Sequence, residues 1–234
     1  MKQRLSLLAL LLLGLSSLPT SAIACGSNPI RVGFFEFPPF YSETETGDAE
    51  GILIDELDRV MTKLGCRWQG RFDPTGKLLE RHINGETDLL MLIQHPLLLE
   101  RARYSLNPVG NLQLNSYWIG DKPPVSSLKD LQGKRVIVIR GYGYGGLFRQ
   151  LSDPANQIKL QMAKDHRHAF ELLSQQQGDY MLGYRRPAEA ALLEAPVDQL
   201  GVQNVKDWDI YFVLSPKYTD QDLIRRLDEV LADR

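Results

Sequence analysis

The sequence predicts an α/β fold made of two lobes, each with a mainly parallel sheet flanked by helices. Short β-branched apolar runs alternate with longer amphipathic segments, which is the pattern of β-α-β units with helical crossovers. The alternation restarts after residue 110, so the chain contains two successive series. Two extended segments, near 111–117 and 203–211, bracket the second series and predict two strand-like crossings between the lobes.

The first series gives three strands and three helices. The strands are predicted at 30–35, 66–72 and 88–93, and the helices at 51–65, 76–85 and 96–103. In the first helix Leu53, Leu57 and Val60 recur at helical spacing, and Gly65 provides the stop. Pro96 favours the first turn of the third helix, because a proline has no amide hydrogen to leave unpaired there.

The second series repeats the pattern and ends in a terminal helix. After an extended segment at 112–120, strands are predicted at 135–139, 158–163, 179–184 and 208–215. Helical segments are predicted at 126–133, 145–151, 165–178, 187–194 and 220–233. Asp165 is the expected N-cap of the helix at 165–178, and Gly178 its stop. We expect residues 25–110 with 206–234 to form lobe 1, and residues 111–205 to form lobe 2.

The first 24 residues have the pattern of a secretory signal peptide. "MKQR" carries two positive charges, and "LSLLALLLLGL" is too short to span a bilayer. Ala22 and Ala24 are the small residues expected before a cleavage site. Later segments lack the roughly 18 consecutive apolar residues of a membrane span. We therefore expect a cleaved, periplasmic protein.

Charge and composition exclude several kinds of partner. Without Lys2 and Arg4, the chain has 25 basic and 29 acidic residues and no run of like charge. A nucleic-acid partner is therefore not expected, because nothing provides a basic patch. His166 and His168 lie on different faces of a helix and do not make a metal site. We expect a monomer that uses no cofactor and binds a small molecule.

Two cysteines, Cys25 and Cys66, leave two interpretations open. Cys25 lies shortly before the predicted strand at 30–35 and Cys66 begins the strand at 66–72, so parallel pairing of those strands places both at one sheet edge. A disulfide between them suits an oxidising compartment. Alternatively, Cys25 follows a small residue at the predicted cleavage site, as in a lipid-anchored protein. Ala22 stands where lipoprotein signals have leucine, which favours the disulfide.

The stretch "RVIVIRGYGYGGLF" contains a glycine-rich loop between a strand and a helical segment. Gly141, Gly143 and Gly146 formally satisfy the dinucleotide fingerprint, and Asp165 lies where that fingerprint has an acid. Export argues against a soluble nicotinamide cofactor. Asp165 is also explained as a helix cap.

The same loop fits a small negative group better. Tyr142 and Tyr144 would crowd a pyrophosphate, whereas the amides of residues 143–146 and the charge of Arg140 favour an anion. The alternative is a tight turn in which glycines adopt positive φ.

Other candidate contacts lie where predicted strands end, because ligands of open α/β sheets bind beyond the carboxyl ends of strands. For the segment "EFPPFY" the alternative is a turn stiffened by prolines, whose aromatic rings fill the end of the lobe. For Gln94 and His95 it is a helix-capping corner before Pro96, and for Tyr184 and Arg185 it is a solvated loop. The full set of predicted ligand contacts is Glu36, Phe40, Tyr41, Gln94, His95, Arg140, Tyr142, Gly143, Tyr144, Gly145, Gly146, Tyr184 and Arg185.

The order of these segments resembles the type II periplasmic solute-binding proteins, near the extracellular solute-binding family 3 that binds amino acids. The features that carry the resemblance are "RVGFFEFPPFYS", "GILIDEL", "INGETDLLM", "SLKDLQGKRVIVIRGYGYGG" and "LLSQQQGDYMLGY". It covers nearly all of the chain after residue 24. It implies a two-lobed periplasmic-binding-protein-like fold with two hinge crossings, and a ligand held in the cleft between the lobes.

Two positions depart from the amino-acid-binding pattern. Such proteins hold the ligand carboxylate with an arginine after the third strand, whereas "IQHPLLLERARYS" offers Arg101 or Arg103 at an altered spacing. The acid that holds the α-amino group lies about five residues beyond the Gly-Asp step of lobe 2. Tyr184 stands there, followed by Arg185. The departures imply an anionic or aromatic ligand rather than a free α-amino acid.

The resemblance implies a non-enzymatic protein that closes on a small polar or anionic solute and is recognised by an ABC permease or a sensor. A second hypothesis is a periplasmic enzyme on the same scaffold, such as a dehydratase of a cyclic carboxylic acid, with Glu36 or His95 as general acid. A third is a sensory lobe without a transport partner. No serine-histidine-aspartate set supports nucleophilic catalysis.

Overall fold

The computed structural model describes Cys25 and residues 28–233, so the predicted signal peptide lies outside the described residues. The strands are β1 (Ile30–Phe34), β2 (Ser42–Glu43), β3 (Ala49–Glu50), β4 (Trp68–Phe72), β5 (Leu89–Leu92), β6 (Arg103–Tyr104), β7 (Gly110–Ile119), β8 (Arg135–Ile139), β9 (Lys159–Ala163), β10 (Tyr180–Tyr184) and β11 (Leu200–Leu214). The α-helices are α1 (Ile52–Leu64), α2 (Thr75–Asn84), α3 (Phe148–Leu151), α4 (His166–Ser174), α5 (Arg185–Glu194) and α6 (Leu223–Ala232).

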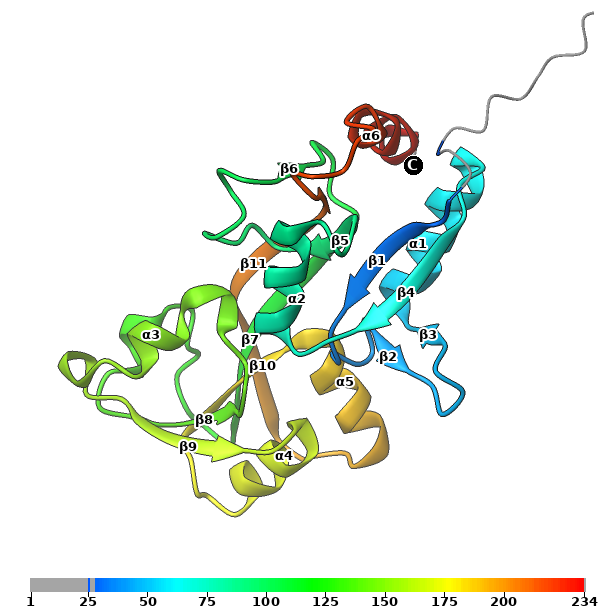
Figure 1. Cartoon of the computed structure of the whole chain (residues 1–234). Helices are drawn as coiled ribbons and strands as arrows, with labels where there is room; N and C mark the ends of the chain where they lie inside the picture. The colour runs from blue at the N-terminus through cyan, green and yellow to red at the C-terminus, as the bar shows by residue number, and fades with distance from the viewer. Residues whose placement is uncertain (1–24, 26–27, 234) are drawn as a thin grey trace, which may run out of the picture.

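The strands of the main sheet follow the order β4-β1-β5-β11-β7-β10-β8-β9, and β6 also pairs with β11. The outer strands of each half pair in parallel: β4 with β1, β1 with β5, β9 with β8, and β8 with β10. Figure 1 shows β1, β4, β5, α1, α2 and α6 in one half and β8, β9, α3 and α4 in the other. This is the predicted α/β architecture of two flanked, mainly parallel sheets.

The two predicted crossings are β7 and β11, which pair antiparallel along most of their length. Residues 200–210 of β11 pair with β7, and residues 211–214 pair with β5 of the other half. The register shifts between Asn204 and Lys206, where the ladder is irregular. Because β11 runs without a break through both halves, it and its partner β7 connect the two halves. The lobe boundaries at 110 and 205 stay a prediction.

In each half, an aspartate next to one strand forms an ion pair with an arginine of the neighbouring parallel strand. In the first half, Asp88 accepts hydrogen bonds from the backbone amide of Arg31 (2.9 Å) and from its guanidinium (2.5 Å). In the second, Asp179 accepts from the backbone amide of Arg135 (2.8 Å) and from its guanidinium (2.8 Å). Hydrogen bonding to Arg135 lowers the pKa of Asp179. The repeated helix-Gly-Asp-strand segments of the sequence thus fix strand pairing in both halves.

A disulfide joins Cys25 to Cys66, with their Cα atoms 5.4 Å apart. β1 and β4 are parallel neighbours, and Ile30 lies opposite Trp68, so both cysteines reach the same sheet edge as predicted. The disulfide occupies the thiol that a lipid anchor would need. It also fits an oxidising compartment.

The predicted helix at 96–103 is wrong. Single-turn hydrogen bonds from Leu98 and Leu99 to the carbonyl of His95 form there, and the chain then enters β6. Leu98 is fully buried, whereas Leu97 and Leu99 keep 56% and 50% of their surface exposed. A helix would need apolar residues three or four positions apart on its buried face. Only Leu98 is buried among residues 96–103, and Ala102 packs partly against the same cluster, so the segment forms hydrogen-bonded turns and not a helix.

His82 is a buried histidine on α2 whose Nε2 atom has no hydrogen-bond partner. Its Nδ1 atom lies 3.4 Å from the Thr87 hydroxyl. Burial is the larger influence on this ring and lowers its pKa to about 4, although the charge of Asp88 acts in the opposite direction. The folded protein therefore holds His82 neutral at pH values where an exposed histidine takes up a proton.

We expect acid to destabilise the protein through His82 between pH 6.5 and about 4. Above this window both states hold a neutral ring; within it only the unfolded state gains the proton, so stability falls as pH falls. The loss reaches up to about 3 kcal/mol, at 1.36 kcal/mol per pKa unit. Urea unfolding at several pH values checks this. His82→Gln should make the dependence shallower without abolishing it, because burial lowers the pKa of His166 to about 4 as well. Parallel curves for the two proteins would contradict the prediction.

Candidate ligand-binding cleft between the two halves

The segment after the carboxyl end of β1 in one half meets the loop after β8 and the last residue of β10 in the other. These segments contain most of the predicted ligand contacts. The clearest link between the halves is aromatic: the ring of Phe37, after β1, lies 5.4 Å from that of Tyr142 and 5.5 Å from that of Tyr184. Both contacts are edge-to-face, a favourable geometry for aromatic pairs.

We call Phe37, Phe40, Tyr142 and Tyr184 the ring cluster. Phe40 stacks on Phe37 at 5.1 Å, and Tyr142 lies 5.4 Å from Tyr184. Burial raises the pKa of Tyr142 to about 12, so its phenol is neutral at physiological pH. Tyr184 hydrogen-bonds to the backbone of Gly145. The structure thus brings together three of the predicted aromatic contacts and adds Phe37, a residue of the same aromatic segment that the sequence ranks below Phe40 and Tyr41.

The other two predicted tyrosines use their hydroxyls inside the protein. The Tyr41 hydroxyl donates to the Met91 carbonyl at 2.7 Å. The Tyr144 hydroxyl accepts from the Ile139 amide at 2.6 Å and donates to the Leu182 carbonyl at 3.2 Å. Tyr144 thereby bridges β8 and β10 where their ladder ends, and its side chain is fully buried. Ligand contact by these two residues stays a prediction without a free hydroxyl to support it.

The glycine loop packs closely against β11. At Gly145, with φ of +60°, a Cβ atom would lie 2.5 Å from the Trp208 indole, so only glycine fits. The Gly146 amide donates to the Gly143 carbonyl at 2.9 Å, and the helix that follows, α3, has four residues. Arg140 is exposed, and its amide donates to the Ala163 carbonyl. The loop's role in binding an anion stays a prediction, and the backbone amides of Gly143 and Tyr144 are the groups that would bind it.

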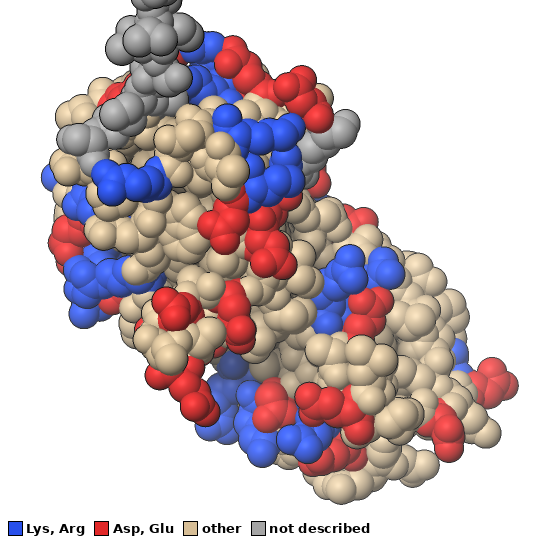
Figure 2. Space-filling model, turned by 90° about the vertical axis from the view of Figure 1, so that its right-hand side faces the viewer, with Lys and Arg blue, Asp and Glu red and all other residues tan. Residues whose placement is uncertain are grey.

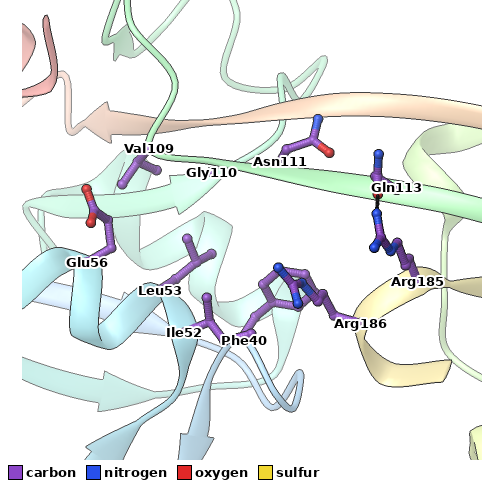
Figure 3. Close-up of a pocket in the computed structure, with 10 residues that line it drawn as sticks. All are labelled: Phe40, Ile52, Leu53, Glu56, Val109, Gly110, Asn111, Gln113, Arg185 and Arg186. Carbon is purple, nitrogen blue, oxygen red and sulfur yellow. Dashed lines mark hydrogen bonds between the residues drawn. The ribbon is translucent and has the colours of Figure 1, made fainter. Parts of the chain in front are cut away.

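A cavity of about 360 Å³ adjoins the ring cluster (Figure 3). It lies between the start of α1, the strand β7 and the start of α5, so both halves line it. Phe40 lines it and also belongs to the ring cluster, so the two spaces share a wall. Its volume is within the range of small-molecule sites.

Two arginines at the start of α5 give this cavity positive charge. Arg185 donates to Gln113 at 2.9 Å and to Glu189 at 2.7 Å. Arg186 lies 3.8 Å from Glu189 and shares that carboxylate. At the other end, Glu56 pairs with Arg59 at 2.5 Å. Of the predicted contacts, Phe40 and Arg185 line this cavity; Arg186 and Gln113 were missed.

The remaining predicted contacts do not line the cavity. Glu36 is exposed and accepts a hydrogen bond from the Glu43 amide at 2.8 Å. Gln94 is exposed as well. The His95 ring accepts from the Leu97 amide at 3.3 Å, and partial burial lowers its pKa. Their role in ligand contact stays a prediction.

His166, at the first position of α4, also borders the ring cluster. Its ring lies 5.7 Å from that of Tyr142, and only 6% of its surface is exposed. Its Nε2 atom has no partner, and burial lowers its pKa to about 4. The sequence offered a signal for this position: His166 follows the carboxyl end of β9, which is a parallel strand of this sheet, and ligand contacts are expected beyond such ends. Within residues 28–233 and Cys25, no group of three histidine, cysteine or acidic side chains could hold a metal ion.

Together, these features define a class: two α/β halves linked by paired crossing strands, with a cleft between their strand ends, as in periplasmic binding proteins. Solved structures agree. The chain is similar to the GluR0 ligand-binding core in complex with L-glutamate, at 18% identity, over 89% of this chain and 92% of that one, with a TM-score of 0.68.

It is also similar to a histidine kinase sensor domain with similarity to periplasmic binding proteins, at 18% identity over 88% of this chain and 89% of that one (TM-score 0.67). An ancestral arginine-binding protein bound to arginine matches at 19% identity over 88% and 91% (TM-score 0.65). No protein-family model matches the chain, and no curated protein matches it in sequence. The chain therefore has the two-lobed fold of periplasmic binding proteins.

No helix among the described residues is long and apolar enough to cross a membrane. Figure 2 shows acidic and basic side chains interspersed over one face of the molecule. That mixture gives this face no large field of a single sign.

Proposed function

We propose that the protein is a non-enzymatic, periplasmic solute-binding protein that closes on a small polar or anionic solute. The observation that carries the proposal is the cleft itself: ring contacts and a cavity are built from residues of both halves, on either side of β7 and β11. A turn about these strands would open and close both. The named structural neighbours are binding proteins and a sensor domain, which supports binding rather than turnover.

The chemistry of the cavity supports a solute with a negative group. Arg185 and Arg186 share one acidic partner, Glu189, so the pair carries an excess positive charge. An arginine guanidinium binds a carboxylate with two parallel hydrogen bonds. The closed form would then be recognised by an inner-membrane ABC permease or by a sensor protein.

A thermal-shift screen of carboxylates, amino acids and aromatic acids tests the proposal. A solute present at 100 times its dissociation constant should add about 2.7 kcal/mol to the free energy of unfolding. No stabilisation by any solute of the panel would refute the binding function.

For a carboxylate that binds in this screen, Arg186→Gln should weaken affinity about 10- to 100-fold, since hydrogen bonds to charged groups contribute roughly 1.5–3 kcal/mol. Titration calorimetry measures the change. Arg167→Gln, which removes an exposed arginine on α4 outside this cavity, is the matched control and should bind as the unmodified protein does. Equal losses in both variants would show that net charge, and not the cavity, holds the solute.

A further inference from the structure

The two halves meet through aromatic rings that each half holds in place by its own hydrogen bonds. Phe37 lies in a tight turn of the first half, where its amide donates to the Tyr41 carbonyl at 3.0 Å and its carbonyl accepts from the Phe40 amide at 2.9 Å. The same turn is fixed to the start of α1, because the Ile52 amide donates to the Pro39 carbonyl at 2.9 Å. Phe37 is therefore a fixed part of the first half.

The rings that face Phe37 are fixed to the second half in the same way. Tyr184 is the last residue of β10 and hydrogen-bonds to the backbone of Gly145. The Tyr142 amide donates to the carbonyl of Ile139, the last residue of β8, at 3.2 Å. Because each ring is tied to its own half, any separation of the halves pulls the Phe37 ring away from both tyrosines.

These contacts are buried to the degree of a protein core. Phe37 keeps 7% of its surface exposed, and Tyr184 keeps 5%. Both belong to one continuous apolar cluster that also contains Val32 of β1 and Val138 of β8, so the cores of the two halves join here. Opening the halves would return this apolar surface to water, which costs free energy in proportion to the area exposed.

We propose that the contacts of Phe37 with Tyr142 and Tyr184 form a latch, which keeps the two halves closed through the protein's own side chains and without any solute. A protein that closes on a solute receives it in the open arrangement, so the latch sets how often that arrangement is available. In this control of solute entry the latch rests on the proposed solute-binding function. Its effect on closure does not, and closure can be measured on the protein alone.

Double electron–electron resonance on the full mature chain tests the latch. Nitroxide labels on Glu80→Cys in α2 and Glu171→Cys in α4, both exposed positions, report the distance between the halves. The native cysteines are paired in the disulfide and take no label. Without solute, the labelled protein should give one short distance. Phe37→Ala and Tyr142→Ala should each add a longer distance and lower the ratio of closed to open molecules by about 10-fold or more, because each removes a ring contact between the halves.

Two further variants are the controls. Phe72→Ala removes a phenylalanine of the first half whose ring lies 5.4 Å from that of Phe34, in the same half. Tyr142→Phe removes a hydroxyl and keeps the ring that meets Phe37. Both proteins should stay closed.

Three results would overturn the latch: a labelled protein that is open without solute, Phe37→Ala and Tyr142→Ala proteins that stay closed, or a Phe72→Ala protein that opens as far as they do. Circular dichroism establishes that each variant is folded. Tyr142→Ala, which removes a partly exposed side chain, provides the answer if Phe37→Ala is not folded.

Stopped-flow mixing tests the control of entry with a solute that binds in the thermal-shift screen. Its association with Phe37→Ala should be about 10-fold or more faster than with the unmodified protein, and an equal rate would overturn that control. Solute binding to a protein that is open beforehand would overturn the latch and leave the binding function standing. A protein that is closed by the latch but binds no solute of the panel would overturn the binding function and leave the latch standing.

Discussion

Replacing Tyr144 with phenylalanine is expected to lower the free energy of unfolding by roughly 2–5 kcal/mol, because each buried polar group left without a partner costs about 1–3 kcal/mol. The variant keeps the ring but loses the hydroxyl that accepts from the Ile139 amide and donates to the Leu182 carbonyl. Both groups lie on fully buried residues of the sheet. Urea unfolding monitored by circular dichroism measures the loss.

Tyr142→Phe is the matched control for this experiment. It removes a hydroxyl from the same loop, two residues away, and no hydrogen bond of that hydroxyl to the described residues is seen. Its unfolding free energy should lie within about 0.5 kcal/mol of the unmodified protein, as for substitutions that break no buried bond. If the two variants unfold alike, the bridge between β8 and β10 is not what stabilises the loop.

Removing the disulfide should cost about 4 kcal/mol. Cys25 and Cys66 are 41 residues apart, and the chain-entropy account gives that value for a closed loop of this length. For a chain of this size, each 1 kcal/mol corresponds to roughly 2–4 °C, so the Cys25→Ser/Cys66→Ser variant should melt about 8–16 °C lower. Thermal unfolding by calorimetry provides the measurement.

Reductant provides a control without mutation. Under reducing conditions the unmodified protein should melt at the temperature of the double variant, and the double variant should not respond. If reductant leaves the unmodified protein unchanged while its intact mass includes a lipid, Cys25 is an anchor instead. A stabilisation much smaller than 4 kcal/mol would mean that the strands β1 and β4 hold the chain start without the bond.

Local patterns predicted most of the fold. The spacing of Leu53, Leu57 and Val60 gave α1, and Gly65 ends it in a left-handed conformation. Asp165 caps α4 by accepting from the His168 amide at 2.8 Å. Such features depend on neighbours within one or two turns, which a single sequence displays directly.

What the sequence could not predict depends on contacts between distant segments. Tyr144 and Tyr142 are two residues apart and look alike, but one bridges two strands while the other faces Phe37 across the cleft. Arg186 reached the cavity because α5 begins at Arg185, directly after β10, earlier than its apolar pattern indicated. β11 extends back to Leu200 because β7 provides a partner along its length. Each of these outcomes depends on contacts between segments far apart in the sequence, and local residue preferences carry no information about such contacts.

The single strand β11 also determines the order in which the molecule can fold. The second half consists of consecutive residues, and its strands β7, β10, β8 and β9 pair with one another without β11. The first half begins the chain, yet β5 receives its antiparallel partner only from residues 211–214, and α1 packs against α6 at the other end of the sequence. Contacts of such high sequence separation form slowly. During synthesis the first half therefore stays incomplete until the chain is almost finished. A truncation within β11 or α6 would leave that half incompletely folded and prone to aggregation, and would not give a shorter folded protein.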